Sequence, residues 1–131
     1  MRENELASTA VEAKAAAYAP YSGYKVGAAL LTKSGKVYTG ANIENASFSP
    51  TVCAERTAFF KAINDGEREF SMIAIAGGKG DSISSAYPCG VCRQVMAEFC
   101  EDDFKILVIK DNGEYDTFTL GNLLPFSFGD I

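Results

Sequence analysis

The sequence predicts an α/β protein built on one mixed, five-stranded sheet with helices packed against it. Three observations support this prediction. Amphipathic helical patterns and short β-type runs alternate along the chain in the order α-β-β-α-β-α-β-β. The 131 residues suit one domain, which we expect to span residues 1–131. A composition of 47% hydrophobic and 22% charged residues is typical of an ordinary globular protein.

The chain begins with a helical pattern followed by a β-hairpin. Leucine and alanine recur at helical spacing over residues 3–18, and Pro20 follows the end of this pattern. Two β-type runs, 24–33 and 36–42, are joined at Ser34-Gly35, which is a typical hairpin turn. We therefore expect one helix and two antiparallel strands in this part.

The middle of the chain predicts a loop, a helix, a buried strand and a second loop. Residues 43–50 are expected to form a loop, and a helix is expected over about 51–64, ended by Gly66. The continuous apolar run 70–78 is typical of a strand buried on both faces. Residues 79–87 form the second polar loop.

The last third predicts a helix, two strands and an irregular tail. Pro88 opens the third helix, because proline is favoured at a first helical position. Residues 104–110 form a buried strand, and the turn at Asn112-Gly113 leads to a further strand over 114–120. The tail, 121–131, contains at most one helical turn.

Charge and hydropathy exclude several classes of function. The net charge is −5, and lysine and arginine are scattered rather than gathered in a basic stripe, so no polynucleotide partner is expected. No apolar run approaches the roughly 20 residues of a membrane span. The N-terminus is polar and does not resemble a signal peptide. We expect a cytoplasmic protein that acts on a small molecule.

The chain contains four cysteines and no histidine. Without a secretion signal, the cysteines indicate metal binding or catalysis rather than a disulfide framework. The absence of histidine excludes Ser-His-Asp and Cys-His nucleophile systems as well as histidine metal sites. Any transition metal must therefore be held by thiolates or carboxylates.

Cys89 and Cys92 have the Cys-x-x-Cys spacing that lets two sulfurs bind one zinc ion at ~2.3 Å. Redox motifs and structural zinc knuckles share this spacing, although a thioredoxin-like pair usually lies earlier in its domain. Cys53 is a candidate third ligand, whereas Cys100 lies two helical turns beyond Cys92 and is too distant. Three ligands with an open fourth position are typical of catalytic zinc.

Glu55 lies two residues after Cys53, where its carboxylate could face a zinc-bound water without binding the metal. Zinc lowers the pKa of such a water to about 7, and a carboxylate can accept and return its protons. The alternative is a first-turn acid that stabilises the helix dipole. The neighbouring candidate ligands favour the catalytic interpretation.

The segments "CAERTA" and "PCGVCRQV" together resemble the zinc-dependent cytidine deaminases of the three-cysteine type. "AYAPYSGYKVGAALLT", "NIENAS" and "LLPFSF" extend the resemblance over most of residues 17–128. It implies a three-layer α-β-α cytidine deaminase-like fold. It also implies hydrolysis of cytidine and 2'-deoxycytidine to uridine, 2'-deoxyuridine and ammonia by a zinc-activated water, as in pyrimidine salvage. Cys53, Cys89 and Cys92 then match the zinc ligands and Glu55 the proton carrier.

The resemblance also assigns substrate contacts. Asn42 and Glu44 match residues that bind the sugar hydroxyls, and the backbone at Ala54 matches a reader of the base edge. Tyr24 stands where the family usually has phenylalanine, stacked on the pyrimidine, and Phe48 where many members have tyrosine. The alternatives are polar loop residues for the first pair and plain core aromatics for Tyr24 and Phe48.

Arg56 is the nearest fixed cation to the three thiolates, which give a zinc site a formal charge of −1. Its fork can donate to two sulfurs, as family members with this motif do. The alternative is a solvent-facing arginine paired with Glu55. We expect charge compensation by Arg56.

The family resemblance further implies a homotetramer whose sites are shared between subunits. Phe128 matches a residue that leans over the substrate of a neighbouring subunit, whereas Phe126 is expected to be core filler.

The main alternative function is that of a blasticidin S deaminase, which shares the cysteine motifs. A zinc-stabilised structural module and an inactive homologue are further alternatives. Deaminases of tRNA or deoxycytidylate usually have histidine as the first ligand, which Cys53 contradicts.

Overall fold

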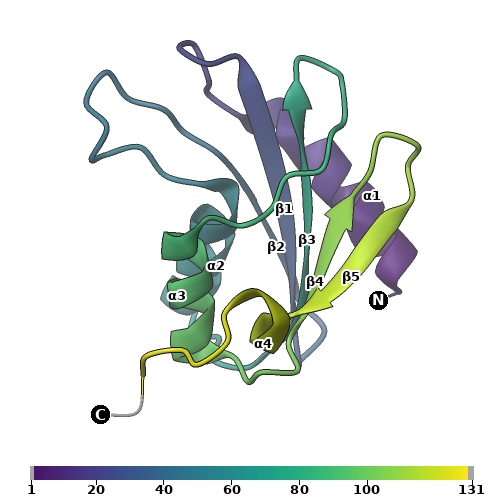
Figure 1. Cartoon of the computed structure of the whole chain (residues 1–131), viewed down its shortest axis with the longest axis vertical. Coiled ribbons are helices and arrows are strands. Elements are labelled where there is room, and N and C mark those ends of the chain that lie inside the picture. The colour runs from purple at the N-terminus through teal and green to yellow at the C-terminus, as the bar shows by residue number, and fades with distance from the viewer. Residues whose placement is uncertain (1, 130–131) are drawn as a thin grey trace.

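The computed structural model describes residues 2–129 and has the predicted order of helices and strands (Figure 1). The elements are α1 (Glu3–Ala13), the 3₁₀ turn η1 (Lys14–Ala16), β1 (Tyr24–Thr32), β2 (Val37–Ala41), α2 (Ala54–Asn64), β3 (Phe70–Lys79), α3 (Gly90–Phe99), β4 (Lys105–Ile109), β5 (Tyr115–Thr119) and α4 (Leu120–Leu123). The last two residues of the predicted tail, 130 and 131, lie outside the described part.

One five-stranded sheet with the order β2-β1-β3-β4-β5 forms the centre of the molecule. β3 and β4 are parallel, and the other neighbouring pairs are antiparallel. The prediction of a mixed five-stranded sheet is therefore confirmed.

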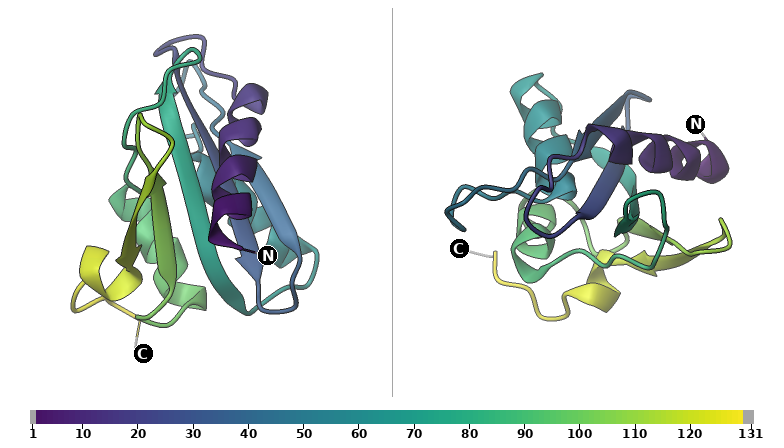
Figure 2. Two further views of the ribbon diagram at one scale, coloured as in Figure 1. Left: turned by 90° about the vertical axis from the view of Figure 1, so that its right-hand side faces the viewer. Right: turned by 90° about the horizontal axis from the view of Figure 1, so that it is seen from above.

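Helices cover both faces of this sheet, which makes three layers (Figure 2). On one face, Leu6 and Ala10 of α1 pack against β-strand residues such as Leu107. On the other face, Phe59 of α2 and Met96 of α3 belong to a second buried cluster. All five side chains are fully buried, so apolar burial stabilises both layers. The predicted α-β-α architecture is confirmed, and none of the helices within residues 2–129 is long and apolar enough to cross a membrane.

Two predicted helices are shorter than expected because the chain pairs with itself beside them. Tyr18 exchanges backbone hydrogen bonds with Asn42 and Glu44, so α1 and η1 end before residue 17 instead of reaching 18. Val52 forms two backbone hydrogen bonds with Ile43, so α2 begins at Ala54 rather than near 51. The third helix begins at Gly90 with Cys89 as its N-cap, so the prediction that Pro88 is its first residue is wrong.

The C-terminal tail corrects one prediction. α4 is a single turn, as expected, after which the chain runs irregularly over the surface. Phe126 is completely exposed and has a positive φ of 55°, so the prediction that it fills the core is wrong. The tail lies along α3, because Arg93 Nη1 donates to the Leu123 carbonyl and Gln94 Nε2 donates to the Phe128 carbonyl.

Candidate active site and metal centre

Cys53, Cys89 and Cys92 converge at the N-terminal ends of two neighbouring helices. Cys53 is the N-cap residue of α2 and Cys89 that of α3, and Cys92 lies in the first turn of α3. The three sulfurs lie within 4.8 Å of one another. Cys89 Sγ is 3.7 Å from Cys53 Sγ and 3.6 Å from Cys92 Sγ.

These separations fit zinc. Two thiolates bound at ~2.3 Å with a tetrahedral angle would place their sulfurs roughly 3.8 Å apart. Three converging thiols, with no partner in a disulfide, also match the soft ligand set that zinc prefers. Three protein ligands leave a fourth tetrahedral position for water or substrate.

A close approach between β2 and α2 fixes the position of Cys53. A Cβ added to Gly40 would lie 2.5 Å from both the Ala54 carbonyl oxygen and the Ala58 nitrogen. Only glycine therefore allows the first turn of α2 to rest on β2. Thr57 also donates through its hydroxyl to the Cys53 carbonyl, which fixes the backbone at the helix start.

Arg56 faces the sulfur cluster rather than solvent. Its Nη2 donates to Cys53 Sγ at 3.3 Å, while its buried Nε has no partner among the described residues. The hydrogen bond from the Cys92 thiol, and then that from Arg56, lower the pKa of Cys53 to about 5 against the opposing effect of burial. The guanidinium therefore stabilises negative charge on the sulfur.

Glu55 is the charged side chain buried beside this cluster, with 4% of its surface exposed. Burial raises the pKa of Glu55 to about 7, and the negative charge of Cys53 adds to this rise. Its position in the first turn of α2 would suit a helix-dipole role, yet its side chain is turned inward. A buried carboxyl beside a metal cluster can hold or release a proton near neutral pH.

Glu55, Cys53 and Cys89 line a cavity of about 450 Å³, whose wall also contains Tyr24 and Ala54. This volume suits a small molecule. A larger hollow of about 870 Å³ lies elsewhere on the sheet, but neither the cysteine cluster nor Glu55 belongs to its lining. The chemistry therefore belongs to the smaller cavity.

Asn42 and Glu44 also line the smaller cavity, as predicted. The Asn42 side chain accepts from the Val26 N–H at 2.8 Å and donates to the Tyr24 carbonyl at 2.9 Å. An amide has two donors and two acceptor sites, so half of this capacity remains for a ligand.

Glu44 is held by the segment that precedes β1. Its Oε1 accepts from the N–H groups of Tyr21 and Ser22, and its Oε2 accepts from the Ser22 hydroxyl. The Ser22 hydroxyl, as the largest influence, lowers the pKa of Glu44. The side chain is thus an oriented carboxylate in the wall of the cavity.

Comparison with known proteins decides which family has this site. The family described as "Cytidine and deoxycytidylate deaminase zinc-binding region" matches residues 1–108. The chain belongs to this deaminase family. A cytidine deaminase from Halalkalibacterium halodurans is 47% identical over 128 residues, which cover 98% of this chain and 95% of that protein. One from Sporosarcina psychrophila is 44% identical, with 98% and 92% covered.

A solved structure supports the same relationship. The crystal structure of a cytidine deaminase from Burkholderia pseudomallei has a TM-score of 0.90 and 43% sequence identity. The match covers 98% of this chain and all of that one. The fold of this chain is therefore that of the family.

Two residues predicted at the deaminase site lie outside this cavity. Phe48 is 92% exposed in the long loop between β2 and α2, and this loop extends from the body of the molecule (Figure 1). Phe128 is 70% exposed in the C-terminal tail. The interpretation of Phe48 as a core aromatic is thus wrong, and within one chain neither ring is brought to the cavity.

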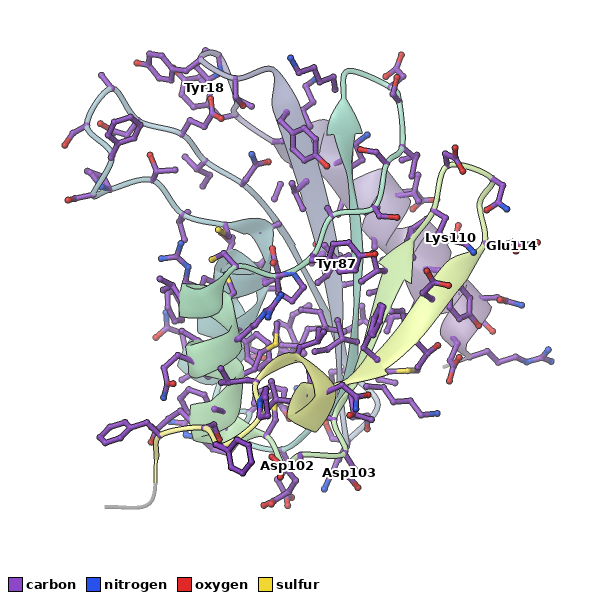
Figure 3. The ribbon with its side chains drawn as sticks, in the orientation of Figure 1. Tyr18, Tyr87, Asp102, Asp103, Lys110 and Glu114 are labelled. Carbon is purple, nitrogen blue, oxygen red and sulfur yellow. The ribbon has the colours of Figure 1, made fainter. Side chains whose placement is uncertain are left out.

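The structure adds cavity residues that the motifs did not indicate. Ser85, Ala86 and Tyr87, from the loop before α3, form part of the wall. Tyr87 extends from this loop and packs edge-on against Phe118 of β5, with ring centroids 5.8 Å apart (Figure 3). The sequence of residues 79–87 indicates only a polar loop, and the aromatic residue directly before Pro88 is the one signal of a role in the cavity.

Proposed function

We propose that this protein hydrolyses cytidine and 2'-deoxycytidine to uridine and 2'-deoxyuridine, releasing ammonia, in pyrimidine nucleoside salvage. One observation carries the proposal. Two thiols of the three-cysteine cluster, those of Cys53 and Cys89, and the buried carboxyl of Glu55 line the same cavity of about 450 Å³. The cytidine deaminases that match nearly the whole chain support the choice of substrate.

Cys53, Cys89 and Cys92 would hold the zinc ion, which supplies Lewis acidity and lowers the pKa of a coordinated water. Glu55 carries the protons. It accepts one from the attacking water and delivers it to the ring nitrogen next to the carbon that bears the amino group. It then transfers the second water proton to the departing amine, so that ammonia leaves and a carbonyl remains.

The other cavity residues orient the nucleoside. The free amide capacity of Asn42 and the oriented carboxylate of Glu44 bind the sugar hydroxyls. The ring of Tyr24 stacks on the pyrimidine. The backbone at Ala54, at the start of α2, reads the polar edge of the base. These groups act by positioning the reacting carbon, which lowers the entropic cost of the reaction.

We further propose that residues 1–131 form one cytoplasmic domain that assembles as a homotetramer. Phe128 and Phe48 are exposed on separate extensions, so each can reach a neighbouring subunit where neither reaches its own cavity. In the tetramer, Phe128 covers the substrate of a neighbour. Analytical ultracentrifugation tests this assembly, and a fully active monomer would refute it.

Glu55→Gln tests the catalytic assignment, because glutamine keeps the size of the side chain but cannot carry the protons. We expect the variant to retain about one zinc per chain while deamination, followed by ammonia release and the change in absorbance, falls at least a thousandfold, within the range attributed to general acid–base catalysis. Glu98→Gln, on the exposed side of α3, is the matched control and should keep full activity. Loss of zinc together with activity in Glu55→Gln would instead make Glu55 a ligand or structural group. Blasticidin S, offered in parallel, tests the rival substrate.

A further inference from the structure

Lys14 is a buried lysine that the proposed reaction does not use. It lies in η1 with 6% of its surface exposed, although lysine is rarely buried without a partner. Its Nζ donates to the carbonyl oxygen of Ser82 at 2.5 Å. Burial, as the main influence, lowers the pKa of Lys14, while the charge of Asp81 opposes this effect. The contact joins two segments that are 68 residues apart in sequence.

Ser82 belongs to the loop between β3 and α3, residues 80–89, which packs on both faces of the sheet. Ile83 contacts the core beneath α1, whereas Ala86 contacts the core beneath α2 and α3. A Cβ added to Gly78 would lie 2.0 Å from the Ser82 carbonyl oxygen, so this carbonyl lies directly against β3. The Ser84 N–H also donates to the Gly77 carbonyl at 2.7 Å.

The second half of this loop forms part of the active site. The hydroxyls of Ser84 and Tyr24 lie 3.2 Å apart, which joins the loop to the aromatic ring in the cavity. Ala86 and Tyr87 line the cavity, and Cys89 ends the loop as a zinc ligand. Ser82 is therefore only a few residues away in sequence from the cavity wall and from Cys89. A displacement of Ser82 would be passed on to both.

We propose that Lys14 is a positioning residue for the active site. Its ammonium holds the Ser82 carbonyl and thereby fixes the β3–α3 loop, so that Tyr87 and Cys89 keep their places. An apolar side chain at this position would leave the carbonyl without its charged donor, and a hydrogen bond to a charged group is stronger than one between neutral groups. The effect on catalysis rests on the proposed function, whereas the effect on the loop does not.

Lys14→Met tests this inference, because methionine has a similar length and suits a neighbourhood that includes Val11 and Ile83. Lys25→Met is the matched control. Lys25 lines the same hollow of about 250 Å³, and its replacement removes the same charge. Among the described residues, however, the Lys25 side chain makes no hydrogen bond to the loop. Both variants are prepared with zinc. Hydrogen–deuterium exchange of residues 82–86, zinc release to a chromogenic chelator, and the KM and kcat for cytidine are measured.

In Lys14→Met we expect loop exchange and zinc release to be roughly tenfold faster, the size expected for loss of a charge-assisted hydrogen bond. The KM for cytidine should rise by a similar factor, with kcat changed less than threefold. Hydrogen–deuterium exchange in β1 should stay as in the wild type, and so should every value measured for Lys25→Met. A lower melting temperature with unchanged loop exchange and zinc release would overturn the inference, because Lys14 would then be structural only.

If Lys14→Met does not fold, Lys14→Gln is measured in the same way. Its amide keeps a donor but is shorter and uncharged, so the same increase in loop exchange is expected. Wild-type exchange in Lys14→Gln would likewise overturn the inference. If the loop loosens as expected but neither enzyme deaminates cytidine, the positioning role stands and the proposed substrate is wrong.

Discussion

Replacing Arg56 by glutamine should weaken the zinc site without unfolding the protein. The guanidinium contacts Cys53 Sγ at 3.3 Å. Hydrogen bonding to this sulfur outweighs the effect of burial, so the pKa of Cys53 is lowered and the thiolate is favoured. Three thiolates around a divalent ion leave one net negative charge. Glutamine has a similar stem but no positive charge, so the variant removes the compensating charge rather than the packing.

The magnitude follows from one charge-assisted hydrogen bond in a partly buried site. Such bonds contribute about 1.5–3 kcal/mol, which corresponds to roughly a 10- to 150-fold change in an equilibrium constant. The N-terminal ends of α2 and α3 also stabilise the thiolates, by about 0.3–1 kcal/mol each, and this contribution remains in the variant. We therefore expect zinc to bind at least tenfold more weakly, and deamination of cytidine to fall by at least the same factor.

The assay is competition for zinc with a chromogenic chelator, followed by deamination at saturating zinc. Arg68→Gln is the control, because Arg68 donates to the carbonyls of Ile63 and Glu67 at the other end of α2, far along the helix from Cys53. Arg56→Lys should fall between wild type and Arg56→Gln, since an ammonium keeps the charge but loses the planar fork. Wild-type zinc affinity in Arg56→Gln would refute charge compensation by Arg56.

Two further predictions concern the folded core. Phe59 is fully buried, with its ring centroid 5.0 Å from that of Phe70. Phe59→Ala should therefore lower the free energy of unfolding, measured in urea, by about 3–5 kcal/mol. A loss below about 1 kcal/mol would contradict the place of Phe59 in the core. Burial raises the pKa of Cys100 to about 12, so the folded state keeps this thiol neutral while the unfolded state ionises it. Stability should therefore fall as the pH rises above about 8.5, by about 1–2 kcal/mol at pH 10, and Cys100→Ala should remove this part of the loss. An identical alkaline loss in both proteins would show that Cys100 is not its source.

Local patterns in the sequence predicted the layers of the fold and the convergence of Cys89 and Cys92. The helical spacing of Ala58, Phe59 and Ala62 was sufficient to place α2 on the sheet, and these side chains are buried as that spacing requires. Cys-x-x-Cys at the start of a helix likewise brings two sulfurs to one point without any knowledge of the rest of the chain.

Features set by contacts distant in sequence were not predictable in this way. The early end of α1 depends on Tyr18 pairing with residues 42–44, and neither segment has a pattern that indicates the other. The hydrogen bond from Lys14 to Ser82 likewise joins segments whose sequences do not indicate each other. Phe126 was misplaced for a related reason. Its hydrophobicity suggested burial, but the turn of α4 directs the chain over the surface after residue 124.

The topology explains why this fold can assemble such a site. β1 is antiparallel to both β2 and β3, so β2, β3 and β4 all run in the same direction. α2 follows β2 and α3 follows β3, and both helices pack on the same face of the sheet. Their N-terminal ends must therefore lie at the carboxyl ends of parallel strands, where α/β proteins bind ligands. Because Cys53 and Cys89 are the N-cap residues of these two helices, the unpaired N–H groups of both first turns favour the thiolate forms that zinc requires. The same geometry brings Glu55 to the cysteine cluster, since a residue two positions into α2 is fixed relative to its N-cap. The three candidate zinc ligands and the candidate proton carrier are thus positioned together by two crossover connections.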